Sequence, residues 1–273
     1  MKQKDILKTR RALPSISNAL HWADLPALEA EILLAHTLEV PRTSLFAHPE
    51  TKLDHTHWEK FQNLVDRRHT GEPIAYLIGY KEFYGMKLKT DPRALIPREE
   101  TEDLVLEALK LNPSSVADLG TGCGAIALAL AKHLLDAKIY ASDVSQQAIE
   151  LAQENAEALG IKFNASSSPV PASKNNQVTF LVGHLAEPIP EPVDLITANL
   201  PYVRNWMIPE LPVEIKDYEP RVALDGGDNG LKLYDELFAT VGNKLKPNGQ
   251  ILYELDGRIY VWTPPKTGSS EGE

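Results

Sequence analysis

Cysteine is almost absent from this chain. Its 273 residues include a single cysteine, Cys123. One thiol excludes an internal disulfide and any metal site built from several thiolates, so we expect a reducing, cytoplasmic setting. His55 and His57 lie close together, but no cluster of Asp, Glu or Cys accompanies them, and we expect no metal site.

Long hydrophobic runs are also missing. No stretch reaches the ~20 apolar residues that spanning a bilayer requires, and the charged N-terminus lacks the apolar core of a signal peptide. Hydrophobic residues nevertheless make up 43% of the chain and aromatic residues 7%, which is enough to bury a core. We therefore expect a soluble protein with no membrane partner.

Basic residues are in the minority, 28 against 38 acidic residues, which gives a formal net charge of -10. Such a surface repels a phosphate backbone, which argues against nucleic acid as a direct substrate. Five cations nevertheless lie close together in the sequence and could form either a local basic groove or the solvated face of a hairpin. The second interpretation is favoured for these residues: Lys81, Lys87, Lys89, Arg93 and Arg98.

The hydrophobic pattern divides the chain into four parts. Residues 1–75 have apolar positions at helical spacing and predict a small helical domain. Aromatic residues and partial alternation around Gly85 predict a β-hairpin linker over residues 76–92. Residues 93–262 form the predicted larger domain, and the composition of residues 263–273 is typical of a disordered tail.

The larger domain reads as alternating strands and helices. Strands are expected at 116–119, 138–144, 178–182, 193–198 and 250–255, with helices at 125–135 and 145–159 between the first three. This alternation predicts an α/β fold with a mostly parallel sheet covered on both faces. The stretch 164–176, rich in Ser, Pro, Ala and Asn, is expected to be a mobile surface loop.

A glycine-rich turn follows the first of these strands, in Asp118-Leu-Gly120-Thr121-Gly122-Cys123-Gly124. Its glycines let the backbone approach a ligand closely, although many parallel sheets use such a turn only to reverse the chain. The spacing is neither that of a dinucleotide site nor that of a P-loop. Asp143 ends the next strand, where an acid can accept both ribose hydroxyls or can cap the following helix, a task that Ser145 could perform instead. Loop and acid together favour an adenosine-containing cofactor.

The most informative segment is Asn199-Leu200-Pro201-Tyr202, directly after a buried strand. Ligands bind at the carboxyl ends of strands in such sheets. The Asn199 side-chain oxygen and the Leu200 carbonyl are both acceptors, so together they can hold the two hydrogens of an NH2 group while Tyr202 stacks on its planar framework. Held in this way, the nitrogen would direct its lone pair toward a sulfonium methyl group, and no general base would be needed. A simple turn after a strand would need neither the Asn nor the Tyr.

With these motifs the chain resembles the release-factor glutamine N5-methyltransferases, the PrmC/HemK family. The resemblance extends from about Glu29 to Leu255. It is carried by segments in both parts of the chain, namely Ala30–His36, Arg42–Pro49, Arg67-Arg68, Gly71–Gly79, Glu82–Gly85, Leu95–Arg98, Glu100–Glu102, Glu219–Arg221 and Leu224–Gly227. It implies a Rossmann-like S-adenosylmethionine-dependent methyltransferase fold with a helical N-terminal domain that recognises the release factor.

The resemblance also implies roles for individual residues. Catalysis and substrate binding would fall to residues 199–202, with the glutamine of the release factor's Gly-Gly-Gln loop between Asn199 and Tyr202. Asn199 would also touch the cofactor. The remaining cofactor-binding residues would be Asp118, Gly120, Thr121, Gly122, Cys123, Gly124, Asp143 and His184. The segment Arg98–Glu102 would lie near the mouth of the site, or would only stabilise a helix N-terminus.

Three departures from the family pattern stand out. The family usually has Asn-Pro-Pro-Tyr, so Leu200 keeps the backbone acceptor and loses rigidity. His184 stands where an acid commonly approaches the adenine, and it could serve there or be a surface residue. Near Asp256 the chain leaves the pattern of a helix and two further strands. The C-terminal strands are therefore expected to be missing, with the fifth strand exposed at an edge that invites pairing with another chain.

The expected function is methylation of the side-chain amide nitrogen of the Gly-Gly-Gln glutamine in release factors, a step in translation termination. Two alternatives stay open. Asn-x-Pro-Tyr is shared with adenine-N6 methyltransferases of RNA and DNA, so the motif indicates the chemistry and not the substrate. The shortened C-terminus is also compatible with a truncated, inactive homologue.

Overall fold

The computed structural model describes residues 13–165 and 178–264. Contacts divide the chain into two compact units, one ending at Ile78 and one beginning at Gly79. The expected hairpin linker over residues 76–92 therefore falls in the second unit except for its first three residues. Most of the expected loop over 164–176 and of the expected tail over 263–273 lies outside the described residues.

The first unit is a helical bundle around its own apolar core. Its helices are α1 Ile16–Trp22, α2 Ala27–Leu38, α3 Ser44–Ala47, α4 His55–His69 and α5 Ile74–Ile78. Asp54 caps α4 by accepting the His57 N–H at 2.8 Å. Trp22 packs edge-on against Trp58 with ring centroids 4.7 Å apart. None of the helices in the described ranges is long and apolar enough to cross a membrane.

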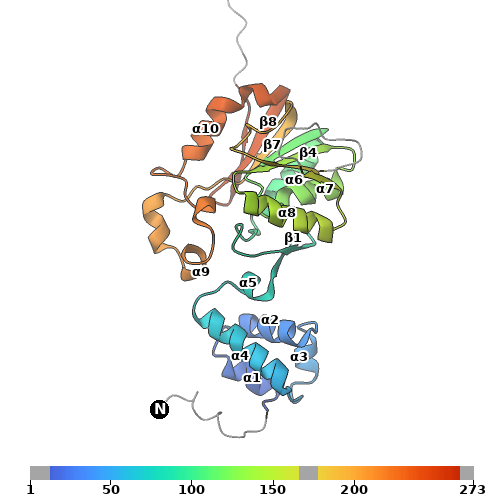
Figure 1. Ribbon diagram of the computed structural model, residues 1–273, viewed down its shortest axis with the longest axis vertical. Coiled ribbons are helices and arrows are strands. Elements are labelled where there is room, and N and C mark those ends of the chain that lie inside the picture. Colours follow the sequence, from blue (N-terminus) through green and yellow to red (C-terminus); the bar gives the residue numbers. More distant parts are fainter. Residues whose placement is uncertain (1–12, 166–177, 265–273) are drawn as a thin grey trace, which may run out of the picture. The chain divides into compact units, whose positions relative to one another are not determined.

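A seven-stranded sheet forms the centre of the second unit (Figure 1). Its spatial order is β5-β6-β4-β3-β7-β8-β9, and all neighbouring pairs are parallel except β8 with β9. The strands are β3 Ser115–Leu119, β4 Lys138–Asp143, β5 Phe163–Ala165, β6 Val178–Val182, β7 Val193–Ala198, β8 Leu245–Leu255 and β9 Arg258–Trp262. The comparatively short β5 includes the first two residues of the expected loop. This sheet confirms the predicted α/β class.

Strand periodicity explains how the sheet is covered. In β4, Ile139 and Ala141 point into one apolar cluster and Tyr140 into the other, because successive side chains alternate between faces. Helices α6 Thr101–Leu111, α7 Ala125–His133 and α8 Gln146–Ala158 pack on the first face, and α10 Lys232–Thr240 packs on the second (Figure 1). Short helical segments complete the chain after β7: η2 Asn205–Glu210, α9 Val213–Lys216, η3 Arg221–Ala223 and η4 Val241–Lys244.

The predicted hairpin is present as β1 Tyr80–Phe83 and β2 Met86–Lys89, paired antiparallel. The buried Asn155 side chain on α8 holds it in place. Its oxygen accepts the Lys89 N–H at 2.7 Å, and its nitrogen donates to the Lys89 carbonyl at 3.2 Å and to the Cys123 carbonyl at 2.9 Å. One side chain thus joins the hairpin, α8 and the glycine loop.

The expectation of an exposed fifth strand is wrong. Strand β9 pairs with β8 along its whole length, from Ile251 opposite Trp262 to Leu255 opposite Arg258. A two-residue turn, Asp256-Gly257, makes this possible, because Asp-Gly favours the tight hairpin turn that matches strand twist. Comparison with the family pattern did not predict this strand, because the pattern has a helix after the fifth strand, whereas here β9 follows β8 directly.

Candidate active site

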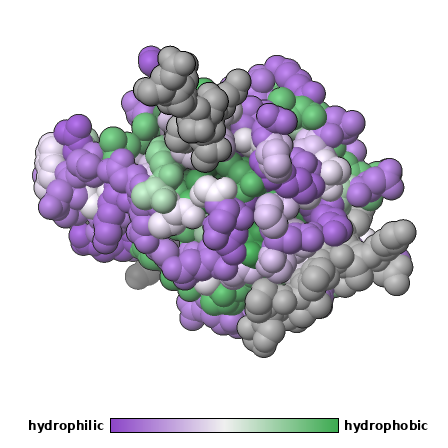
Figure 2. All heavy atoms as spheres, turned by 90° about the horizontal axis from the view of Figure 1, so that it is seen from above, coloured by the Kyte–Doolittle hydropathy of each residue, from purple (hydrophilic) through white to green (hydrophobic). Residues whose placement is uncertain are grey.

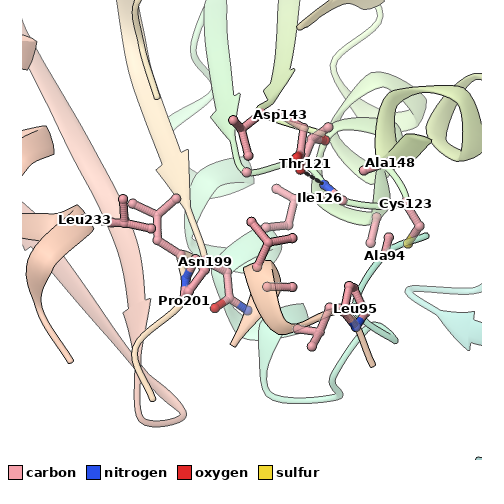
Figure 3. Close-up of a pocket in the computed structure, with 18 of the residues that line it drawn as sticks. Ala94, Leu95, Thr121, Cys123, Ile126, Asp143, Ala148, Asn199, Pro201 and Leu233 are labelled. Carbon is pink, nitrogen blue, oxygen red and sulfur yellow. Dashed lines mark hydrogen bonds between the residues drawn. The ribbon is translucent and has the colours of Figure 1, made fainter. Parts of the chain in front are cut away.

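The order of strands places a crevice at the carboxyl ends of β3 and β7. The chain progresses from β3 through β4 to β6 in one direction and from β7 to β8 in the other, and such a switch point leaves room for a ligand. A cavity of about 580 Å³ lies there, within the usual range for a small-molecule site. Figure 3 shows Asp143, Thr121, Asn199 and Pro201 around it, contributed by different elements.

Nine of the twelve expected site residues line this cavity: Gly120, Thr121, Gly122, Cys123, Asp143, His184, Asn199, Leu200 and Pro201. Among the described lining residues, Asp118, Gly124 and Tyr202 do not occur. The structure thus brings together residues from four separate segments, which follow or end β3, β4, β6 and β7.

Asp118, on β3, fixes the glycine loop through a hydrogen bond to Thr121. This carboxylate is fully buried and accepts the hydroxyls of Thr121 at 2.6 Å and Thr197 at 2.9 Å. Burial raises the pKa of Asp118 to about 6, against the stabilising effect of the two threonine hydrogen bonds. The sequence placed Asp118 among cofactor ligands, but its contacts are those of a residue that ties the loop to β3 and β7.

Asp143 lies at the end of β4 and also holds the loop. Its two oxygens accept the N–H groups of Gly122 and Ser145, both at 2.9 Å. Burial raises the pKa of the Asp143 carboxyl. The side chain of Ser145 caps α8, which leaves the remaining lone pairs of Asp143 for a ligand in the cavity.

The loop and the acid fit an adenosine-containing group. Gly122 has a positive φ of 56°, so its backbone lines the cavity in a conformation that other residues rarely adopt. Apolar side chains of Ile126, Leu185 and Leu233 line the cavity as well. The cavity thus combines apolar walls with one carboxylate on a strand end, as a nucleoside requires.

Asn199 follows β7, and its amide orientation is defined by two acceptors. Its nitrogen donates to the Thr101 hydroxyl at 2.9 Å and to the Glu254 carboxylate at 3.0 Å. The amide oxygen is thereby turned away from both acceptors. The sequence placed Thr101 within the segment Arg98–Glu102 near the mouth of the site without giving it a role, and Arg98 and Thr101 do line the cavity. Sequence reasoning missed Glu254, although an acid within the apolar run of β8 was a usable signal.

The backbone after Asn199 is held by α10 and by a later loop. The Tyr234 hydroxyl accepts the Leu200 N–H at 3.0 Å and donates to the carbonyl of Glu254. The Leu200 side chain is 3% exposed and belongs to the apolar cluster on the α10 face of the sheet. Leucine therefore provides packing where the family's proline would provide rigidity.

The segment Leu224–Gly227 packs directly against the Pro201-Tyr202 backbone. Val203 donates to the Leu224 carbonyl at 3.0 Å, and the Gly226 N–H donates to the Val203 carbonyl at 2.8 Å. A Cβ on Gly226 would lie 2.7 Å from the Tyr202 Cα and 2.8 Å from the Pro201 oxygen. Only glycine permits this approach, which explains the first glycine of the Gly226-Gly227 pair.

A partly buried ion pair links two segments of the cavity wall. Arg98 donates to Glu219 at 2.6 Å, and the other Glu219 oxygen accepts the Ile96 N–H at 3.1 Å. Burial raises the pKa of Glu219, partly offset by the charge of Arg98. Arg98 and the neighbours of Glu219, Pro220 and Arg221, line the cavity.

His184 also lines the cavity, and its Nε2 lies 2.8 Å from a Glu236 oxygen.

The five cations of the expected basic cluster are mostly paired. Lys81 contacts Glu99, Lys89 and Arg93 contact Glu154, and Arg98 contacts Glu219, while Lys87 lies over the Tyr80 ring. Figure 2 shows a predominantly hydrophilic face with small apolar patches.

Comparison with known proteins gave matches along most of the chain. Residues 11–79 match the family model described as PrmC N-terminal domain, and residues 99–203 match the model described as methyltransferase small domain. A release factor glutamine methyltransferase of Moorella thermoacetica is 39% identical over 236 residues, 84% of this chain and 78% of that protein. Proteins of the same name from Koribacter versatilis and Geobacter sulfurreducens are 36% and 37% identical, over 90% and 84% of this chain and 85% and 76% of theirs.

Proposed function

Because this chain belongs to the release factor glutamine methyltransferase family, we propose that it methylates the glutamine side-chain nitrogen in the Gly-Gly-Gln motif of peptide chain release factors. Family membership confirms the expected class of enzyme, a methyltransferase that uses S-adenosylmethionine. A release factor as substrate would place the reaction in the cytoplasm, where translation terminates.

The cofactor would occupy the cavity at the ends of β3, β4 and β7. Its sulfonium carries the methyl group that the reaction transfers. Asp143 would accept the ribose hydroxyls, and the backbone of Gly120 and Gly122 would approach the cofactor closely, because both glycines line the cavity beside this carboxylate. His184 would contribute an imidazole near the adenine. Asp118 would keep the glycine loop in place through its hydrogen bonds to Thr121 and Thr197.

The observation that carries the proposal is the fixed orientation of Asn199. Its nitrogen is bound by Thr101 and Glu254, so its oxygen is the part of the amide left to accept a hydrogen bond from a substrate NH2 group. The Leu200 carbonyl is the proposed second acceptor. Two acceptors of this kind orient the substrate nitrogen and stabilise the positive charge that develops on it, so a general base is not required.

An RNA or DNA adenine has a similar planar NH2 group, so the acceptors alone do not distinguish it from glutamine. Two features favour a protein substrate. The net charge is -10, and four of the five neighbouring cations near the hairpin are neutralised by carboxylates. The third interpretation, an inactive homologue, is disfavoured because residues 199–201 line an intact cavity beside the glycine loop.

Transfer of a labelled methyl group tests the proposal. Purified release factor, a Gly-Gly-Ala variant of its Gly-Gly-Gln motif and total rRNA serve as parallel acceptors. Label on the unmodified release factor alone is the expected result. Label on rRNA would assign the chain to the adenine class instead, and cofactor binding without any transfer would identify an inactive homologue.

A further inference from the structure

The Asn199 side chain belongs to a small polar cluster at the wall of the cavity. Thr101 begins α6 and Glu254 lies near the end of β8, and their side chains converge on the Asn199 nitrogen. The two residues are 5% and 3% exposed. Neither carries any of the proposed contacts to the substrate.

The donors and acceptors of this cluster match only in one arrangement. The Asn199 nitrogen donates to the Thr101 hydroxyl at 2.9 Å and to the Glu254 carboxyl at 3.0 Å, so both neighbours act as acceptors toward it. Burial raises the pKa of Glu254, and in its ionised form the carboxylate can only accept, so Asn199 presents an N–H group to it. A rotated amide would place its oxygen against the carboxylate, which is repulsive in a buried site.

The presence of Glu254 itself calls for an explanation. Burying a carboxylate costs free energy unless it is paired, yet in the described part of the chain no Lys, Arg or His forms an ion pair with Glu254. A buried apolar residue or a glutamine would cost less at this position. A requirement for an obligate acceptor beside Asn199 accounts for the carboxylate.

We infer that Thr101 and Glu254 are positioning residues, which hold the Asn199 amide with its oxygen directed toward the substrate nitrogen. The inference rests on the proposed function of Asn199 as an acceptor. Thr101 lines the cavity and Glu254 does not, and neither is assigned a contact to the cofactor, so the inference predicts a larger effect on turnover than on cofactor binding.

Thr101→Val tests the inference, because valine keeps the shape of threonine and removes the hydroxyl. Thr101→Ser keeps the hydroxyl, and Thr179→Val is a matched control because the buried Thr179 hydroxyl has no hydrogen-bond partner in the described structure. Steady-state kcat and KM with the release factor, S-adenosylhomocysteine affinity by calorimetry and thermal midpoints are measured for all three variants.

We expect kcat of Thr101→Val to fall roughly 10- to 100-fold, as for a misplaced reacting group. Thr101→Ser and Thr179→Val should stay within about threefold of the wild type, on the same grounds of an unchanged acceptor position. Glu254→Gln should also lower kcat, since glutamine can turn its NH2 toward Asn199 and allow the amide to rotate. A kcat loss in Thr179→Val equal to that in Thr101→Val would show that the effect comes from disturbed core packing, and it would overturn the inference.

An NMR measurement separates this inference from the proposed function. With ¹⁵N-labelled asparagine, the Asn199 NH2 hydrogens should exchange slowly in the wild type and faster in Thr101→Val and Glu254→Gln. Equal exchange in all three proteins would refute the positioning role even if the wild type methylates release factor. Slow exchange in a wild type that transfers no methyl to release factor would instead support the proposed orientation of the Asn199 amide and reject release factor as the substrate.

Discussion

Asn199 shows how a single side chain can combine a short sequence motif with contacts far away in the chain. Its nitrogen is bound to Thr101, 98 positions earlier, and to Glu254, 55 positions later. The exposed acceptor is therefore a product of α6 and β8 as much as of the motif itself. Removing the side chain should affect chemistry more than folding.

We predict that Asn199→Ala lowers methyl transfer by roughly 100-fold or more, as loss of a preorganised acceptor does elsewhere. The free energy of unfolding should change by only about 1–3 kcal/mol, the usual cost of removing the hydrogen-bond partner of a buried polar group. Transfer assays and denaturant unfolding measure the two effects. Asn205→Ala, which removes an exposed amide, is the control. Full activity in Asn199→Ala would reject the proposed role of this residue.

Asp118 allows a prediction of pH dependence. Its pKa of about 6 in the folded protein lies above the ordinary value of 3.8, so the folded state favours the protonated form. The contribution of this group to stability is therefore present at low pH and lost as the pH rises from about 4 to 6. One pKa unit corresponds to about 1.4 kcal/mol, so the loss amounts to roughly 3 kcal/mol.

The variant Asp118→Asn lacks this ionisation. The difference in unfolding free energy between variant and wild type should shift in favour of the variant as the pH increases across that window. Urea unfolding at a series of pH values measures the difference. A difference that stays constant between pH 4 and 7 would contradict the assigned burial effect.

At the scale of elements, two loops form one structural unit. The chain after β7 and the Leu224–Gly227 segment are joined by backbone hydrogen bonds and by the contact at Gly226. The Tyr234 hydroxyl on α10 adds a third attachment, because it accepts the Leu200 N–H. The backbone around the proposed Leu200 carbonyl acceptor is therefore fixed by α10 at residue 200 and by the Leu224–Gly227 segment at residues 201–203.

Gly226→Ala should displace the Pro201-Tyr202 backbone, because the added Cβ meets backbone atoms that cannot rotate away. We expect a loss of transfer of roughly tenfold or more and a destabilisation of about 1–3 kcal/mol, the usual cost of overpacking. Gly242→Ala is the matched control, since a Cβ there meets nothing within 4 Å. Equal behaviour of the two variants in activity and melting would show that the contact does not position the site.

At the scale of the whole molecule, β9 completes the edge of the sheet. Tyr260 stacks on Tyr253 across the hairpin with ring centroids 5.4 Å apart, and Trp262 stacks on Phe238 of α10 at 5.3 Å. Strand β9 thus covers β8, the strand that carries Glu254. Loss of β9 should affect both the stability of the sheet and the site.

A chain that ends at Leu255 should melt at a lower temperature than the full chain and should self-associate, because β8 would become an uncovered edge. A chain that ends at Pro264 keeps β9 and serves as the control. Melting followed by circular dichroism and sedimentation velocity measure the two properties. A monomer with an unchanged melting temperature after removal of β9 would show that this strand contributes little.

Several features of the protein were predictable because they depend on neighbours in the sequence. The strand before Gly120, the acid at Asp143 and the turn after β7 are local patterns, and the carboxyl ends of parallel strands must share one edge of the sheet. That geometric rule is sufficient to bring the cofactor loop and residues 199–201 around one cavity. The hairpin around Gly85 was predictable for the same local reason.

Features that depend on partners distant in the chain were not predictable. The burial of Asp118 behind the loop, the pairing of β9 with β8 and the convergence of Thr101, Glu254 and Tyr234 on residues 199–200 have no local signature. The sequence by itself determined the fold class and the chemical type of the site. Only the tertiary structure decided which way the Asn199 amide points, because a hydrogen-bond orientation is set by the donors and acceptors that folding brings around it.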